Sequence, residues 1–213
     1  MMGMILFTRA SIMDKQKSVT TARQPATRRG TKKRDTHERI VQSGSRIARR
    51  RGLRAASVPR VMRGAGLTTG GFYAHFRSKT AMDAEVTRAM LTPLRGLEDL
   101  QDTGLVWLQR AVKRYLTVAH RDNVDGCAYP AVLSEMAWAS ADVRREFATA
   151  LATRVYAFET HTPATDNITA RDRALATVAL TIGGLLLARA ARGNPISEEM
   201  LSACRAWALP EAQ

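Results

Sequence analysis

The side chains best suited to chemistry lie close together in one short stretch of the sequence, residues 57–79. They carry hydroxyl, imidazole and ammonium groups, which can form hydrogen bonds with phosphate oxygens and with the edges of bases. Two adjacent glycines in the same stretch would let the backbone lie close against another surface. The candidate DNA-contacting residues are Ser57, Thr68, Thr69, Gly70, Gly71, Tyr73, His75 and Lys79.

Three short helical segments are expected to position these residues. Ser57 is suited to cap a segment that runs to Ala65 and ends at Gly66, Thr68 to cap the next segment, and Ser78 to cap a further helix. Two short helices joined by a tight turn that contains glycine form a helix-turn-helix, whose second helix can enter the major groove of DNA. A plain helical corner without a nucleic-acid partner is the alternative.

The spacing within the second segment separates its inner side from its outer side. Phe72 and Phe76 are four residues apart and so are expected to face the interior. On the outer side, Thr69 could meet a thymine methyl group or a base edge. The side chains suited to phosphate contacts, which set the register without reading the sequence, are Tyr73, His75 and Lys79.

The charge of the chain is concentrated in the part that contains this stretch. The 213 residues carry a net charge of +14, with 45% hydrophobic and 24% charged residues. Residues 1–90 hold 20 Lys and Arg against 5 Asp and Glu, whereas residues 91–213 hold 13 against 14. Because a diffusely basic protein would not show this division, it favours polyanion binding by the first part over a merely solubilising tail.

Helical periodicity recurs along the chain and predicts an all-α fold. Beyond residue 34 no alternating strand pattern of useful length and no repeat is found, whereas Pro93, Gly96 and Pro163 interrupt helical patterns. The longest uncharged run, Ala174–Ala188, has 15 residues, too few to span a bilayer, so a buried helix is expected. Residues 1–33 are polar, basic and without periodicity, and are interpreted as a flexible arm.

The sequence shows no clear residue pattern for a metal site or for catalysis. Two distant cysteines without a CxxC pair fit a reducing cytoplasm, and the four histidines lack metal-ligand spacing with them, so no cofactor is predicted. An enzyme with Cys127 or His120 as nucleophile or base is the alternative, but no Ser/His/Asp or paired-carboxylate arrangement accompanies them. The chain is predicted not to be an enzyme.

Aromatic and polarisable residues of the second half could surround a cavity for a small molecule. Ordinary core packing of these residues is the alternative, and a sensing role for the Cys127 thiol would require a lowered pKa. The candidate ligand-binding residues are Trp107, Tyr115, Cys127, Tyr129, Met136 and Trp138.

The pattern Ala65-Gly66-Leu67-Thr68-x-Gly70-x-Phe72-Tyr73-x-His75-Phe76-x-Ser78-Lys79, within residues 34–86, resembles the N-terminal domain of the TetR family of bacterial transcriptional repressors. The resemblance implies a homodimer that places its third helices in successive major grooves of a palindromic operator, and a C-terminal domain that binds a small-molecule effector. It implies three parts: a flexible basic arm (1–33), a helix-turn-helix DNA-binding domain (34–80) and a helical ligand-binding and dimerisation domain (81–213). Two places depart from the family pattern, Gly44-Ser45 and Arg63-Gly64, where bulkier residues or better helix formers are usual.

The C-terminal half is similar to one TetR subgroup at two places. Residues 126–130, Gly-Cys-Ala-Tyr-Pro, are similar to a turn of that subgroup, and residues 182–190 to its dimerisation helix. Gly183, Gly184 and Ala188 would let two helices approach closely across a dimer axis, or would pack within one subunit. The resemblance implies a cytoplasmic repressor that has no membrane partner. Its effector would release it from DNA. A ligand-independent architectural DNA-binding protein is the alternative.

Overall fold

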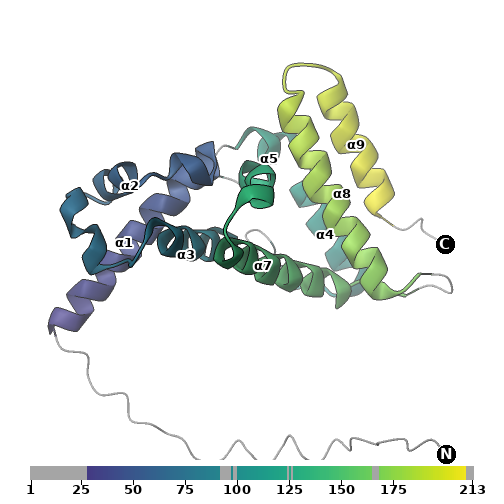
Figure 1. Cartoon of the computed structure of the whole chain (residues 1–213). Helices are drawn as coiled ribbons and strands as arrows, with labels where there is room; N and C mark the ends of the chain where they lie inside the picture. The colour runs from purple at the N-terminus through teal and green to yellow at the C-terminus, as the bar shows by residue number, and fades with distance from the viewer. Residues whose placement is uncertain are drawn as a thin grey trace, which may run out of the picture. The chain divides into compact units, whose positions relative to one another are not determined.

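The computed structural model describes residues 28–91, 97, 100–123, 125, 127–164 and 168–209. Every element in these ranges is a helix, which confirms the all-α prediction (Figure 1). The elements, with η for short 3-10 helices, are α1 (Arg28–Arg51), η3 (Leu53–Ala55), α2 (Val58–Gly64), η4 (Thr69–Ala74), α3 (Lys79–Leu91), α4 (Gly104–Tyr115), α5 (Val118–Asp122), α6 (Tyr129–Val132), η5 (Leu133–Trp138), α7 (Ala141–Glu159), α8 (Ala170–Ala190) and α9 (Ile196–Ala208).

Helix α1 extends into the expected flexible arm. It begins at Arg28, so residues 28–33 of the expected flexible arm are helical, while residues 1–27 lie outside the described residues. The breaks expected at Pro93 and Gly96 lie outside them as well. One compact unit starts at Asp35 and includes both the helix-turn-helix and the C-terminal helices. The domain boundary near residue 80 stays a prediction.

The helix-turn-helix is built as its sequence pattern indicates. Phe72 and Phe76 are both buried, with their rings stacked at a centroid distance of 5.5 Å, which confirms that they face inward. The turn depends on Gly66, whose φ of 70° lies in the left-handed region that favours glycine. Ser78 caps α3 as expected, since its Oγ accepts a hydrogen bond from the Ala81 N–H at 3.1 Å.

The glycines that depart from the family pattern have a packing role. A Cβ atom at Gly44 would lie 2.6 Å from Cγ2 of Val86, so this glycine lets α1 approach α3 closely. Gly64 is likewise crowded by the Ser43 side chain, across the contact between α1 and α2. Small residues at these two places therefore allow the helices to pack together, at the expense of intrinsic helix propensity.

Helices α7, α8 and α9 form the C-terminal core, with α8 packed against both of the others. By length and composition α8 could cross a membrane, but a core helix has the same character. One side of α8, which includes Val178, Ile182 and Leu185, is buried against its neighbours, whereas Leu187 is exposed. Gly184 faces α9 within the chain, where a Cβ atom would lie 2.6 Å from Cys204 Sγ, and Ala188 is fully buried. Intrachain packing therefore explains these two small residues, whereas a Cβ at Gly183 would meet nothing within 4 Å.

Candidate DNA-binding surface and effector cavity

The turn and η4 present most of the candidate DNA contacts to solvent. Ser57 at the start of α2 is exposed, and so are the residues from Thr68 to Gly71. Tyr73 projects outward with 79% of its surface exposed. The hydroxyls of Ser57 and Thr68 make no side-chain capping bond, so both can donate to a phosphate.

His75 and Lys79 are half-buried, which differs from the outward position expected of phosphate contacts. The His75 ring lies 6.0 Å from that of His37, and Nε2 of His37 is 2.6 Å from a carboxylate oxygen of Glu85. Nζ of Lys79 donates to both carboxylate oxygens of Asp83 at 2.6 Å. Burial raises the pKa of Asp83, an effect that the Lys79 ammonium opposes. Both residues lie at the margin of the exposed surface, and their DNA contacts stay predictions.

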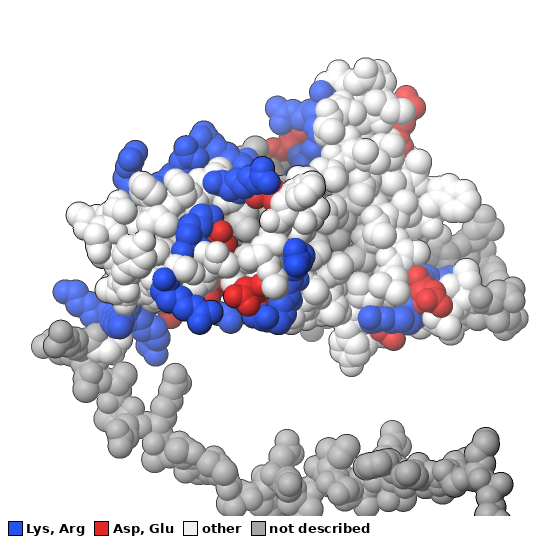
Figure 2. Space-filling model, in the orientation of Figure 1, with Lys and Arg blue, Asp and Glu red and all other residues white. Residues whose placement is uncertain are grey.

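Exposed arginines extend this surface beyond the candidates chosen from the motif. Figure 2 shows Lys and Arg side chains gathered over the helix-turn-helix part of the molecule. The uneven charge of the sequence indicated such a surface, although it could not say which residues form it. The exposed cations of the described helix-turn-helix part include Arg54, Arg60, Arg63 and Arg77.

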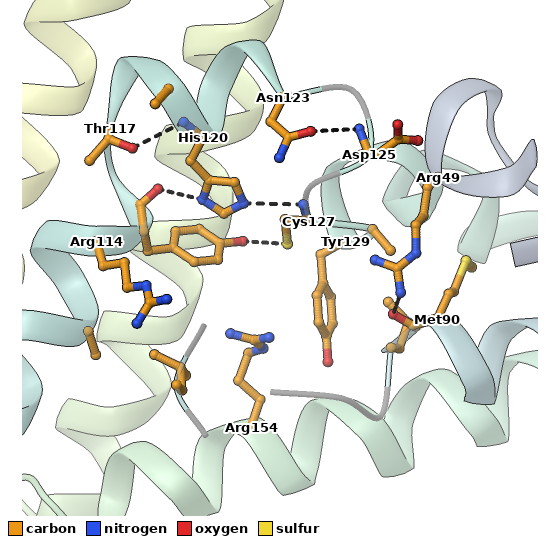
Figure 3. Close-up of a pocket in the computed structure, with 16 residues that line it drawn as sticks. Arg49, Met90, Arg114, Thr117, His120, Asn123, Asp125, Cys127, Tyr129 and Arg154 are labelled. Carbon is orange, nitrogen blue, oxygen red and sulfur yellow. Dashed lines mark hydrogen bonds between the residues drawn. The ribbon is translucent and has the colours of Figure 1, made fainter. Parts of the chain in front are cut away.

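A cavity of about 390 Å³ lies among α4, α5, α7 and the segment before α6 (Figure 3). Three candidate ligand-binding residues line it, Tyr115, Cys127 and Tyr129. The other residues of its lining are Arg49, Met90, Leu91, Leu97, Ala111, Arg114, Thr117, Ala119, His120, Asn123, Asp125, Ala128 and Arg154.

The other three candidates do not line this cavity. Trp107 is buried in the core, where it stacks on His161 at 4.2 Å between ring centroids. Met136 is also buried, and Trp138 is exposed at the surface. Core packing, the alternative considered for these aromatic and polarisable residues, therefore explains Trp107 and Met136. Trp138 lines a separate, smaller pocket of about 170 Å³.

His120 and Tyr115 hold the Cys127 segment at the cavity wall. His120 Nδ1 lies 2.7 Å from the Tyr115 carbonyl oxygen and donates to it, while His120 Nε2 accepts a hydrogen bond from the Cys127 N–H at 3.2 Å. Burial lowers the pKa of His120, and these two bonds require the neutral ring. The Cys127 thiol lies 2.8 Å from the Tyr115 hydroxyl. The structure thus brings Cys127 and His120 together through the backbone, and the imidazole does not bond the thiol.

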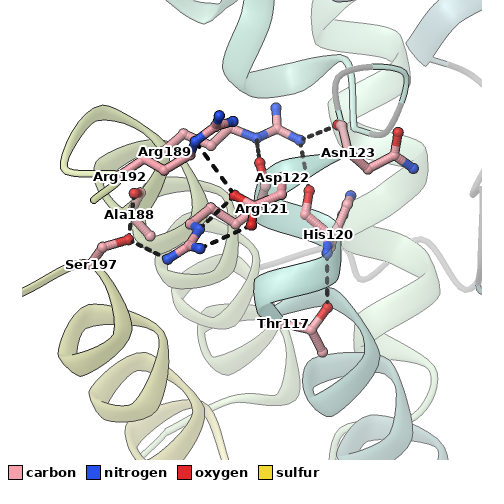
Figure 4. Close-up of polar contacts among 9 residues, drawn as sticks. All are labelled: Thr117, His120, Arg121, Asp122, Asn123, Ala188, Arg189, Arg192 and Ser197. Atoms are coloured by element: carbon pink, nitrogen blue, oxygen red, sulfur yellow. Dashed lines mark hydrogen bonds and ion pairs between the residues drawn. The ribbon is translucent and has the colours of Figure 1, made fainter. Parts of the chain in front are cut away.

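Two arginines fasten the same segment to the last two helices (Figure 4). The Arg189 guanidinium, from α8, donates to the carbonyl oxygens of His120, Arg121 and Asn123 at 3.0–3.3 Å. Arg121 donates to Ser197 Oγ at 2.9 Å, and this hydroxyl donates to the Ala188 carbonyl oxygen at 2.7 Å. These hydrogen bonds connect the cavity wall to α8 and α9.

The opposite side of the cavity is joined to the end of α1. Arg50 donates two hydrogen bonds of 2.6 Å to the Asp125 carboxylate, which lowers the pKa of Asp125. The buried Arg49 donates to the Met90 carbonyl oxygen at 2.7 Å, and the Arg54 N–H donates to Glu135 at 2.8 Å. The described residues of the segment from His120 to Cys127 are thus bonded both to α1, through Asp125, and to α8, through Arg189. The sequence pattern does not reveal these contacts, because their partners are far apart in the chain.

Within the part of the chain that the structure describes, no cluster of three or more His, Cys, Asp or Glu residues could hold a metal ion. An exposed, basic helix-turn-helix is the arrangement of a DNA-binding protein.

Comparison with known protein families identifies the family of the helix-turn-helix part. The family described as "Bacterial regulatory proteins, tetR family" matches residues 40–86. The DNA-binding domain therefore belongs to the TetR family, and the chain has the architecture of a TetR-family transcriptional regulator. No curated protein sequence matches the chain significantly.

Solved structures share the fold over most of the chain. The reduced form of Escherichia coli NemR has a TM-score of 0.65 at 19% identity, over 81% of this chain and 96% of that one. A TetR-family regulator from Agrobacterium tumefaciens also reaches 0.65, at 15% identity, over 82% and 95%. NalD, the secondary repressor of the MexAB-OprM multidrug efflux pump in Pseudomonas aeruginosa, reaches 0.56 at 18% identity, over 86% and 100%. At these identities the likeness concerns the fold alone.

Proposed function

We propose that the protein is a cytoplasmic, homodimeric transcriptional repressor that binds a palindromic operator and leaves it when a small molecule occupies the cavity. The main support for the proposal comes from the contacts of one segment, from His120 to Cys127. It lines the cavity, is bonded to α1 through Arg50 and Asp125, and is bonded to α8 through Arg189. A ligand that displaces this segment would change the placement of the helix-turn-helix relative to the C-terminal helices and so weaken DNA binding.

Exposed apolar residues on α8 and α9 support a dimer. Leu187 and Trp207 are exposed although both are large and apolar, and Gly183 is open to close approach by another helix. Leu180, Gly183 and Leu187 recur at helical spacing on α8, as Ile196, Ala203 and Trp207 do on α9. A second copy of the chain could cover both faces with an apolar four-helix contact, and two-fold symmetry would match a palindromic site.

The alternative is an architectural DNA-binding protein without an effector. A filled C-terminal core would favour that alternative, whereas a cavity of about 390 Å³ falls within the usual range for small-molecule sites. The cavity and its bonds to α1 therefore favour the repressor.

Selection of bound sequences from a random pool of double-stranded DNA tests the proposal. We expect one palindrome whose half-sites lie in successive major grooves, contacted by Thr69, Gly70 and Tyr73 of each subunit. The Arg60→Gln variant tests a contact to phosphate rather than to a base. It should bind operator and random DNA more weakly to the same extent, and the salt dependence of its DNA binding should be smaller. Binding with no sequence preference would contradict the repressor and favour the architectural protein.

A further inference from the structure

The strongest unexplained feature of the cavity is Arg154, a buried cation. It follows Ala150 and precedes Phe158 by four residues each, so it lies on the buried face of α7. Only 5% of its surface is exposed, and its guanidinium points into the cavity (Figure 3). Its Nε has no hydrogen-bond partner among the residues that the structure describes.

Aromatic rings, and no carboxylate of the cavity lining, lie against this guanidinium. It lies 5.0 Å from the ring centroid of Tyr129 and 5.8 Å from that of Tyr115. Asp125, an acidic residue of the cavity lining, accepts hydrogen bonds from Arg50 with both of its carboxylate oxygens. Cation–π contacts offset part of the desolvation of a buried cation, but much less than a paired anion does. The guanidinium therefore favours an anionic group in the cavity.

The rest of the lining fits an anion that has an apolar body. Leu91, Ala111 and Ala128 add apolar surface beside the two tyrosine rings. Burial raises the pKa of Tyr115 and of Tyr129, so both phenols stay neutral near pH 7. A planar guanidinium matches a carboxylate with two parallel hydrogen bonds, which a neutral amide cannot equal.

We propose that the cavity binds an organic carboxylate, whose carboxylate group pairs with the Arg154 guanidinium and whose apolar body lies against Tyr115 and Tyr129. That this carboxylate is the effector rests on the function proposed above. The site itself does not, because its occupation can be measured on the protein without DNA.

Isothermal titration calorimetry with matched probes tests the site. The probes are three pairs of a carboxylate and its primary amide: benzoate and benzamide, 1-naphthoate and 1-naphthamide, and decanoate and decanamide. We expect at least one carboxylate to bind the unmodified protein at least about tenfold more tightly than its amide. Equal affinity within every pair, or no binding by any carboxylate at millimolar concentration, would overturn the proposal.

Variants of α7 assign the preference to one side chain. Arg154→Gln should abolish the difference between carboxylate and amide, whereas Arg154→Lys should keep part of it because the charge remains. Arg145→Gln is the matched control, since Arg145 lies on the same helix, is exposed and does not line the cavity. A preference that survives Arg154→Gln in folded protein would show that another group binds the anion and would overturn the assignment.

The operator affinity measured with and without the carboxylate distinguishes the proposed binding site from the proposed release mechanism. A carboxylate that binds through Arg154 and also releases the selected operator supports both. A carboxylate that binds through Arg154 but leaves operator affinity unchanged supports the site and contradicts the proposed release mechanism.

Discussion

Replacing Phe72 by alanine is expected to lower the free energy of unfolding by about 3–5 kcal/mol. Phe72 is 1% exposed and packs against Phe76 in the core of the helix-turn-helix, so its removal leaves a cavity that the short η4 cannot easily close. Urea denaturation followed by far-UV circular dichroism measures the change. A loss below about 1 kcal/mol would contradict the packing described here.

Tyr73, which follows Phe72 in the sequence, is the matched control, because its replacement should affect DNA binding rather than stability. Tyr73 is largely exposed, and its ring makes an edge contact with Phe72, at 5.2 Å between ring centroids. Tyr73→Ala should change the free energy of unfolding by less than about 1 kcal/mol, yet weaken operator binding by about tenfold. If Tyr73→Ala left operator affinity unchanged, the exposed face of η4 would not be the DNA-contacting surface.

Introducing a charge on the exposed face of α8 is expected to separate the dimer. Leu187→Glu would place a carboxylate in the proposed apolar contact, where its desolvation would oppose association. Because a monomer holds only one half-site, operator affinity should fall by about 10²–10⁴-fold. Sedimentation equilibrium measures the association, and fluorescence anisotropy with labelled operator measures the affinity.

Leu105→Glu is the control for this substitution. Leu105 on α4 is 42% exposed, compared with 54% for Leu187, and it lies outside the proposed dimer face. The Leu105→Glu protein should remain dimeric and bind the operator normally. A Leu187→Glu protein that is still a dimer with unchanged operator affinity would exclude this face as the interface.

The helix-turn-helix could be predicted because its signals are local. The inward spacing of Phe72 and Phe76, the glycine of the turn and the cap of α3 each depend on residues a few positions apart. The helical residues 28–33 were assigned to the flexible arm, because they have no apolar periodicity.

The cavity was only partly predictable because it depends on contacts between distant segments. Tyr115, Cys127 and Tyr129 were recognised as candidates by residue type, but type alone could not separate them from Trp107, which packs in the core. Arg154 interrupts an apolar face and resembles an ordinary surface arginine in sequence. A cationic residue four positions from two buried ones was the available signal.

If occupation of the cavity weakens DNA binding, chemical modification of a thiol at the cavity wall should weaken it as well. Cys127 is half-buried and lines the cavity, whereas Cys204 is buried between α8 and α9. Treatment with N-ethylmaleimide, with mass spectrometry to verify a single adduct on Cys127, would fill part of the cavity without knowledge of the effector.

The dissociation constant for the selected operator is then compared before and after modification. We expect it to rise by about 5–150-fold, with a smaller rise in Asp125→Asn, which loses the charged link to Arg50, and none in the treated Cys127→Ser protein. Complete modification of Cys127 with an unchanged dissociation constant would contradict the coupling between the cavity and the DNA-binding surface.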